Sequence, residues 1–168
     1  MKAEAITALI KGLKSAGINF VTTLPSSAFT PVIPHIMRDP YFKHVPVGNE
    51  SDGVVICAGA WMGGKKPALM MENTGVVVSA HDLSGLECQY GGFPMLLIVD
   101  HRGSFGDGAA YFYFASGQVA PIVLDTLKIP YIIVRDSEKL PSEIVSGQKT
   151  AEAYGKPVAV LFSEEEKL

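Results

Sequence analysis

Residues 43–75 read KHVPVGNESDGVVICAGAWMGGKKPALMMENTG, and this stretch indicates the fold. It opens with a short extended segment, continues through a helical run dense in small residues, and ends in an apolar segment. Strand and helix patterns alternate in the same way along the rest of the chain. Such an alternation is typical of a parallel sheet with helices on both faces.

Six apolar runs are predicted as strands, and four of them open with a proline, which the first position of a strand tolerates. The predicted strands are residues 18–24, 43–47, 67–71, 94–99, 130–134 and 157–162. The predicted helices are an opening helix from residue 3 toward Gly17, then residues 28–37, 51–63, 79–90, 118–128 and 138–154. Strands with nearly continuous apolar runs are covered on both faces. We therefore expect residues 1–168 to form a single three-layer α/β domain of the flavodoxin-like kind, with a mostly parallel six-stranded sheet.

The composition excludes several classes of partner. The 168 residues include 14 basic and 17 acidic side chains, a net charge of -3, without the basic surface that nucleic acids or anionic membranes require. No apolar run approaches the roughly 20 residues of a membrane span, and two isolated cysteines make no disulfide framework. The first residues do not have the pattern of a leader peptide, so we expect none. We therefore expect a cytoplasmic protein. Its 48% of hydrophobic residues predicts a protein interface.

The sequence lacks the motifs of several kinds of chemistry. The four histidines and two cysteines do not have the ligand spacing of zinc sites, so we expect no metal site from this chain alone. It contains no GxSxG elbow, Walker A loop or dinucleotide fingerprint. Small molecules and proteins remain as the expected partners.

Glu50 stands where such a fold binds ligands. In an open parallel sheet the ligand crevice lies outside the carboxyl ends of the strands, and Glu50 belongs to the second loop at that edge, VGNES. In apolar surroundings such an acid has a raised pKa and can exchange a proton with a ligand nitrogen. The alternative is a helix-cap acid that only satisfies backbone donors beside Asn49 and Ser51.

The helix after Glu50 is rich in small residues, among them Gly53, Ala58 and Gly59. Glycine inside a helix costs about 1 kcal/mol relative to alanine, so a close contact must compensate. That contact is either another subunit, in which case Ala58→Leu would weaken assembly, or the chain's own sheet.

The stretch NESDGVVICAGAWMGGKKPALMMENTG at 49–75, followed by FPMLLIVDHRG at 93–103, resembles the alpha subunit of sulfopyruvate decarboxylase and the N-terminal half of phosphonopyruvate decarboxylase. The resemblance implies that the chain is the pyrimidine-binding domain of a thiamine diphosphate enzyme. The reaction that it implies is the non-oxidative loss of carbon dioxide from a 2-oxo acid. In that family the acid that matches Glu50 activates the aminopyrimidine ring of the cofactor.

The other candidate site residues lie in the crevice loops, and the resemblance supports those of the third and fourth loops. The cofactor contacts, in three loops, would be Pro25, Ser26, Glu50, Asn73, Thr74 and Gly75. The substrate contacts would be Ser27, His101 and Arg102, of which His101 and Arg102 would bring positive charge to an anionic substrate. Two alternatives stay open: the serines can be helix N-caps, and the arginine can be a structural clamp.

Half of the cofactor machinery is missing from this sequence. In the family, a second domain binds Mg²⁺ and the diphosphate through a GDG motif and a downstream asparagine. The chain has FGDG at 105–108, but its only asparagines are Asn19, Asn49 and Asn73, so we interpret residues 106–108 as a loop. We expect a beta-type partner subunit to supply the diphosphate and Mg²⁺ site. The enzyme would be a hetero-oligomer, active only when both subunits are present.

Two departures from the family concern the substrate. Residues 72–78 read ENTGVVV where the relatives read QNSGLGN, which predicts a more apolar pocket floor. Residues 111–114 form the aromatic run YFYF, which can be a lid, a partner contact or buried packing. The substrate would be sulfopyruvate, phosphonopyruvate or a more apolar 2-oxo acid. Alternative functions are carboligation with the same cofactor and a non-catalytic scaffold subunit that retains the fold.

Overall fold

The computed structural model describes residues 1–104, 107 and 111–163. Its centre is a six-stranded sheet in the order β2-β1-β3-β4-β6-β5, in which every neighbouring pair is parallel. The strands are β1 Phe20–Thr23, β2 Lys43–Pro46, β3 Pro67–Glu72, β4 Met95–Asp100, β5 Tyr131–Val134 and β6 Pro157–Phe162. The α/β class and the parallel six-stranded sheet predicted from the sequence are confirmed.

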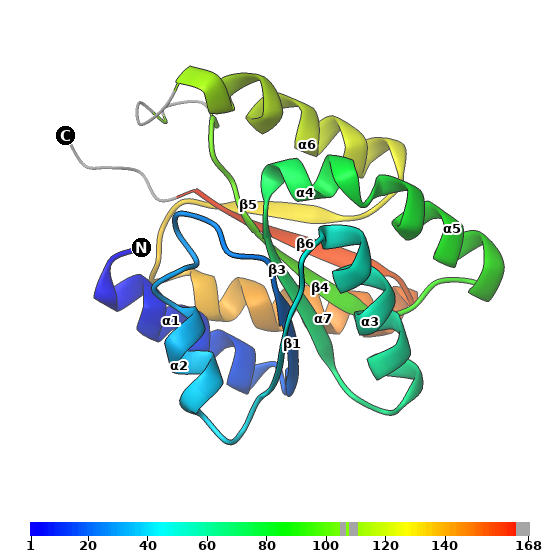
Figure 1. Ribbon diagram of the computed structural model, residues 1–168, viewed down its shortest axis with the longest axis horizontal. Coiled ribbons are helices and arrows are strands. Elements are labelled where there is room, and N and C mark those ends of the chain that lie inside the picture. The colour runs from blue at the N-terminus through cyan, green and yellow to red at the C-terminus, as the bar shows by residue number, and fades with distance from the viewer. Residues whose placement is uncertain (105–106, 108–110, 164–168) are drawn as a thin grey trace.

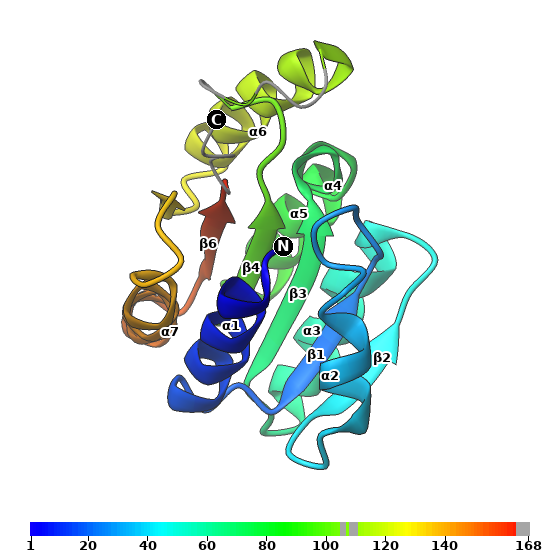
Figure 2. The ribbon, with the colours of Figure 1, turned by 90° about the vertical axis from the view of Figure 1, so that its left-hand side faces the viewer.

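Helices cover both faces of the sheet, as Figure 1 and Figure 2 show. One apolar core lies between the sheet and α1, α2 and α7, and a second lies between the opposite face and α3 to α6. The helices are α1 Ala3–Ser15, α2 Ile33–Arg38, α3 Glu50–Met62, α4 Asn73–Val78, α5 Ala80–Tyr90, α6 Phe114–Thr126 and α7 Leu140–Tyr154, with a 3-10 turn at Tyr111–Tyr113. Across the described residues, no helix has both the length and the apolar character needed to cross a bilayer.

Burial along the strands follows their position in the sheet. Every residue of β4 and β6 is buried, and so is every residue of β3 except the last. The edge strands β2 and β5 are partly exposed. The expectation that the strands are covered on both faces therefore holds for the centre of the sheet and not for its edges.

The helix α4 replaces a predicted loop. Its three consecutive valines have low helix propensity because they are β-branched, so the sequence pattern does not predict a helix there. In the structure Val76 is packed in the core, and the Ser79 hydroxyl donates a hydrogen bond to the Gly75 carbonyl over 2.6 Å. Tertiary contacts override local propensity at this position. Two other helices begin away from their predicted starts, α2 at Ile33 and α6 at Phe114.

The small residues of α3 face the chain's own sheet in part. A Cβ atom on Gly53 would lie 2.7 Å from Leu69 Cδ1, and Ala58 is buried in the core. Gly59 has open space beside it. Ala58→Leu therefore cannot test for a subunit contact, because this substitution would disturb the core whether or not a subunit docks on α3.

The two cysteines differ in environment, and this difference makes a simple prediction. Cys57 is fully buried, with its sulfur 3.2 Å from Thr22 Oγ1, and burial raises the pKa of its thiol to about 12. Cys88 is exposed on α5. Because the thiolate is the reactive form, we expect iodoacetamide to modify Cys88 alone in the folded chain and both cysteines after denaturation, as measured by peptide mass mapping. Equal modification rates in the folded chain would contradict the packing of α3.

Candidate active site

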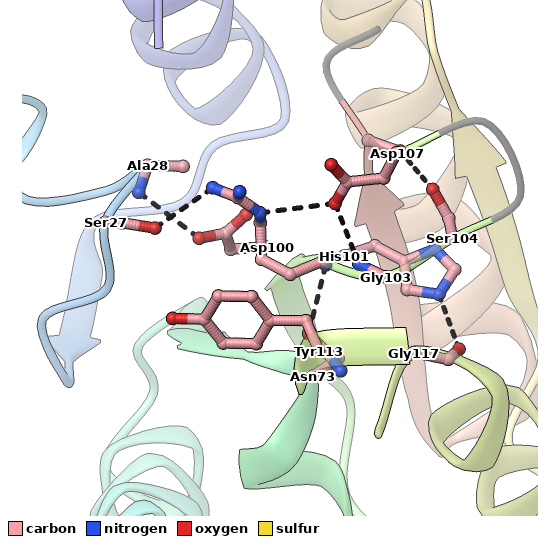
Figure 3. A network of polar contacts seen from close by, with 12 residues as sticks. Ser27, Ala28, Asn73, Asp100, His101, Gly103, Ser104, Asp107, Tyr113 and Gly117 are labelled. Atoms are coloured by element: carbon pink, nitrogen blue, oxygen red, sulfur yellow. Dashed lines mark hydrogen bonds and ion pairs between the residues drawn. The ribbon is translucent and has the colours of Figure 1, made fainter. Parts of the chain in front are cut away.

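Three chain segments meet at the carboxyl edge of the sheet, because β1, β3 and β4 are consecutive neighbours there. The loop after β1 contains residues 25–28, α4 begins directly after β3, and the turn after β4 contains residues 101–103. Figure 3 shows side chains from these segments pointing toward one another. The candidate ligand contacts other than Glu50, which begins α3 after β2, lie on the same segments.

Glu50 is the first residue of α3, and only 9% of its surface is exposed. The cap of this helix is Asn49, whose Oδ1 accepts a hydrogen bond from the Ser51 amide over 2.7 Å. Among the residues that the structure describes, none forms a hydrogen bond or an ion pair with the Glu50 carboxyl. Asn49, and not Glu50, therefore caps the helix, and the Glu50 oxygens remain available to bind a ligand.

Gly75 allows α4 to lie directly against Glu50. A Cβ atom at this position would be 2.5 Å from Glu50 Cγ and 2.9 Å from Glu50 Oε1, and also 2.9 Å from Met71 Sδ. Contacts this short do not occur with a side chain, so the position requires glycine. The first turn of α4 thus forms one wall of the space around the Glu50 carboxyl.

Asn73 ties the start of α4 to the turn after β4. Its side chain is fully buried; Oδ1 accepts a hydrogen bond from the Arg102 amide over 3.0 Å, and Nδ2 donates to Ser116 Oγ over 3.1 Å. A buried amide with both ends bonded is a structural group. Asn73 therefore shapes the site, and its own polar atoms already have partners.

His101 is buried, with 3% of its surface exposed, and its Nε2 donates a hydrogen bond to the Gly117 carbonyl over 2.9 Å. Burial lowers the pKa of the imidazole. The positive charge that the sequence suggests for this residue is therefore not favoured by its environment. Nδ1 has no hydrogen-bond partner among the described residues.

Gly103 brings α6 onto the turn after β4. Its φ angle is +71°, and a Cβ atom there would lie 2.0 Å from the Tyr113 carbonyl oxygen. The Gly103 carbonyl accepts a hydrogen bond from Gln118 Nε2 over 3.1 Å. Both the left-handed backbone and the close approach require glycine. The HRG segment is thus a turn built to receive the start of α6.

The Arg102 side chain links two segments of the site. Nη1 donates to Ser27 Oγ over 3.1 Å, Nε faces Asp107 Oδ2 over 3.4 Å, and the guanidinium carbon lies 5.3 Å from the centre of the Tyr113 ring. Arg102 therefore acts as a clamp between the loop after β1 and the turn after β4. Both of its hydrogen-bond acceptors are side-chain oxygens.

A cavity of about 260 Å³ lies beside Arg102. Its lining includes all three predicted substrate contacts, Ser27, His101 and Arg102. The other polar residues that line it are Lys2, Asp100, Asp107 and Ser163. The predicted cofactor contacts Glu50, Asn73, Thr74 and Gly75 do not line this cavity and form a separate group at the starts of α3 and α4. Of the remaining predicted contacts, Pro25 is exposed and Ser26 is buried.

Asp100 is a site residue that the sequence interpretation missed. It is the last residue of β4, 3% exposed, and its Oδ2 accepts hydrogen bonds from Ser26 Oγ over 2.8 Å and from the Ala28 amide over 3.2 Å. The pKa of this carboxyl is raised, because the effect of burial is larger than the opposing effects of these hydrogen bonds and of Arg102. The available signal was an acid that ends an otherwise apolar strand at the ligand edge of the sheet.

The structure shows where the residues that depart from the family pattern lie. Val76 faces the core, while Val77 and Val78 are exposed on α4 and do not line the cavity, so they do not form the apolar floor expected there. Tyr111 and Phe114 are 91% and 60% exposed, which argues against buried packing of these two rings. Of FGDG, only Asp107 lies within the described residues, and residues 164–168 of the tail lie outside them.

Comparison with curated proteins gives relatives over nearly the whole chain. The chain is 33% identical to the sulfopyruvate decarboxylase subunit alpha of Methanothermobacter thermautotrophicus, over 96% of this chain and 97% of that protein. It is 30% identical to the protein of the same name from Methanococcus maripaludis, over 95% of this chain and 94% of that protein. The chain belongs to the sulfopyruvate decarboxylase alpha-subunit family. No protein-family model matches it.

A solved structure supports the fold of this sulfopyruvate decarboxylase alpha-subunit family member. It is the 2-oxoglutarate:ferredoxin oxidoreductase from Magnetococcus marinus, solved with 2-oxoglutarate, coenzyme A and succinyl-CoA bound. The superposition has a TM-score of 0.72 at 21% identity and covers 98% of this chain and 29% of that chain. At this identity the similarity is one of fold.

The contact between Gly75 and Glu50 yields a prediction about stability. We expect Gly75→Ala to lower the free energy of unfolding by about 1–3 kcal/mol, because the new methyl group overlaps Glu50 and Met71. The matched control is Gly85→Ala on α5, where a Cβ atom meets nothing within 4 Å, and where alanine should be neutral or stabilising by up to about 1 kcal/mol. Urea denaturation of both variants measures the difference. Equal stabilities would show that α4 does not pack on Glu50 as described.

Proposed function

We propose that this chain is the pyrimidine-binding alpha subunit of a thiamine diphosphate-dependent 2-oxo acid decarboxylase, a lyase. One observation carries the proposal within this family: Glu50 is a buried carboxyl at the ligand edge of the sheet, with no partner among the described residues. Gly75, which has no side chain, lets the start of α4 lie directly against it. These features fit the ring nitrogen of an aminopyrimidine, which needs one hydrogen-bonding acid in a narrow, mostly apolar slot.

The chain would contribute placement and one acid. Thiamine diphosphate, when bound, supplies the electron sink for the electron pair released with carbon dioxide. The Glu50 carboxyl would hydrogen-bond to the ring nitrogen and pass a proton to it. The walls around the ring would be Pro25, Ser26, Asn73, Thr74 and Gly75. Because the side chains of Ser26 and Asn73 are already bonded within the protein, these two would act through the backbone that they hold.

The cavity beside Arg102 would receive an acidic group of the substrate. A guanidinium stays charged at all relevant pH values and can bind a carboxylate, sulfonate or phosphonate through two parallel hydrogen bonds. Ser27 would add a hydroxyl donor. We assign His101 to holding the turn, since its burial disfavours the charged form. A small polar cavity favours a compact 2-oxo acid with a second acidic group over a bulky apolar one.

A beta-type partner subunit would complete the enzyme. The curated relatives carry the name subunit alpha, and the sequence has no asparagine downstream of its GDG segment to complete an Mg²⁺ site. Asp107 of that segment accepts a hydrogen bond from the Gly103 amide over 2.8 Å and is used within the turn. The diphosphate and Mg²⁺ would therefore bind to the partner, and the active site would form between the subunits.

Glu50→Gln tests the role of the acid. In the complex with its partner we expect this variant to lose roughly a hundredfold or more of the decarboxylation rate, because an amide cannot pass the proton. The matched control is Asp52→Asn in the same first turn of α3, an exposed acid that should keep full activity. Release of carbon dioxide from sulfopyruvate measures both. Full activity in Glu50→Gln would refute the assignment.

Cofactor retention tests the split site. We expect native mass spectrometry to show no bound thiamine diphosphate on the chain alone, and a cofactor-sized mass increase only when the partner subunit and Mg²⁺ are both present. Tight binding by the isolated chain would place the diphosphate site here instead.

The same complex tests the two alternative functions. Failure of the assembled complex to bind the cofactor would favour the scaffold interpretation. Products formed with an added aldehyde would reveal carboligation.

A further inference from the structure

We infer that Asp100 is a positioning residue, which sets the loop after β1 in place across the end of β3 and thereby places Ser26 and Ser27. This inference rests on the proposed function for its consequence, since those two serines are the proposed contacts of cofactor and substrate. The structural part of the inference depends only on the hydrogen bonds of Asp100.

The contacts cross from one strand to another that is not its neighbour. β1 and β4 lie on opposite sides of β3 in the sheet, yet Asp100 Oδ2 accepts hydrogen bonds from both Ser26 Oγ and the Ala28 amide. Ser26 Oγ in turn accepts a hydrogen bond from the Phe29 amide over 3.1 Å. Donor and acceptor roles of this hydroxyl are thus both used, so its direction is fixed, and residues 26–29 are held by one buried oxygen.

The loop after β1 has a second attachment, which ends at the same turn. Arg102 Nη1 donates to Ser27 Oγ, so two residues of the DHR segment hold three consecutive residues of the loop. Figure 3 shows Asp100 beside Ala28 and Ser27. The Arg102 contact is exposed, whereas the Asp100 contact with Ser26 is buried and that with Ala28 is partly buried. Because hydrogen bonds shielded from water are the costlier ones to lose, Asp100 is the principal anchor of the loop.

Because both hydrogen bonds end on one oxygen of Asp100, substitutions can distinguish a positioning role from a role of the negative charge. Both donors reach Oδ2, so an amide oxygen at the same place accepts both hydrogen bonds without a negative charge. Asp100→Asn therefore keeps the anchor, and Asp100→Ala removes it. A residue that acted through its charge or as an acid would lose its role in both variants.

Hydrogen–deuterium exchange of the full chain tests the geometry directly. In Asp100→Ala we expect exchange in peptides covering residues 25–32 to become about tenfold faster or more, as the loss of a buried acceptor implies. In Asp100→Asn it should remain close to the wild-type rate. Peptides from α7 serve as the internal control and should not change in either variant, which also shows that the chain is folded. Unchanged exchange in Asp100→Ala, or equal acceleration in both variants, would overturn the inference.

Kinetics of the assembled complex test the consequence. We expect Asp100→Ala to raise the KM for the 2-oxo acid by about tenfold, a loss of the size that one misplaced polar contact gives, and Asp100→Asn to restore most of the affinity. A loosened loop with an unchanged KM would overturn the link to substrate binding. If the wild-type complex has no decarboxylase activity, the proposed function fails, while the exchange experiment still decides the role of Asp100.

Discussion

Hydrogen bonds at the turn after β4, one of them buried and two partly buried, hold the ligand edge of this protein together. The turn backbone is bonded to the amide of Asn73 at the start of α4 and to the side chain of Asp107 within its own loop, and the ring of His101 is bonded to α6. Backbone groups at the end of a buried strand cannot stay unpaired without a large cost. Partners from separate parts of the chain meet this need, and in doing so they bring the candidate site residues together.

The fold could be predicted because its signals are local. Continuous apolar runs marked the buried strands β3, β4 and β6, and their predicted lengths match the structure closely, since burial on both faces leaves no polar face to interrupt the pattern. The edges were harder: β2 and β5 are partly exposed, as a sequence run alone does not reveal position in a sheet. Helix α4 was missed because only its contacts with the core and with Glu50 make three valines helical.

Some residues of the candidate site could also be predicted from the sequence, and others could not. Glu50 was found because an acid at the start of a small-residue helix, at the end of a strand, stands out in the sequence, and the family resemblance singles it out as well. Asp100 was missed because its significance comes from Ser26 and Ala28, which are more than 70 positions away in the chain. For His101 the residue type suggested a charge, but burial lowers its pKa. Burial and distant partners are properties of the folded chain that spacing does not encode.

The close contact between the turn after β4 and α6 also has a dynamic consequence. With Gly103 on one side and Gly117 on the other, no side chain separates this turn from the beginning of α6: a methyl group on Gly117 would lie 2.3 Å from the Arg102 carbonyl oxygen. Elements in such direct contact open as one unit. Any fluctuation that lifts α6 must also release the turn and, with it, the arginine and aspartate at the cavity. The lifetime of the assembled site is therefore limited by the local stability of a helix that contributes none of the proposed ligand contacts.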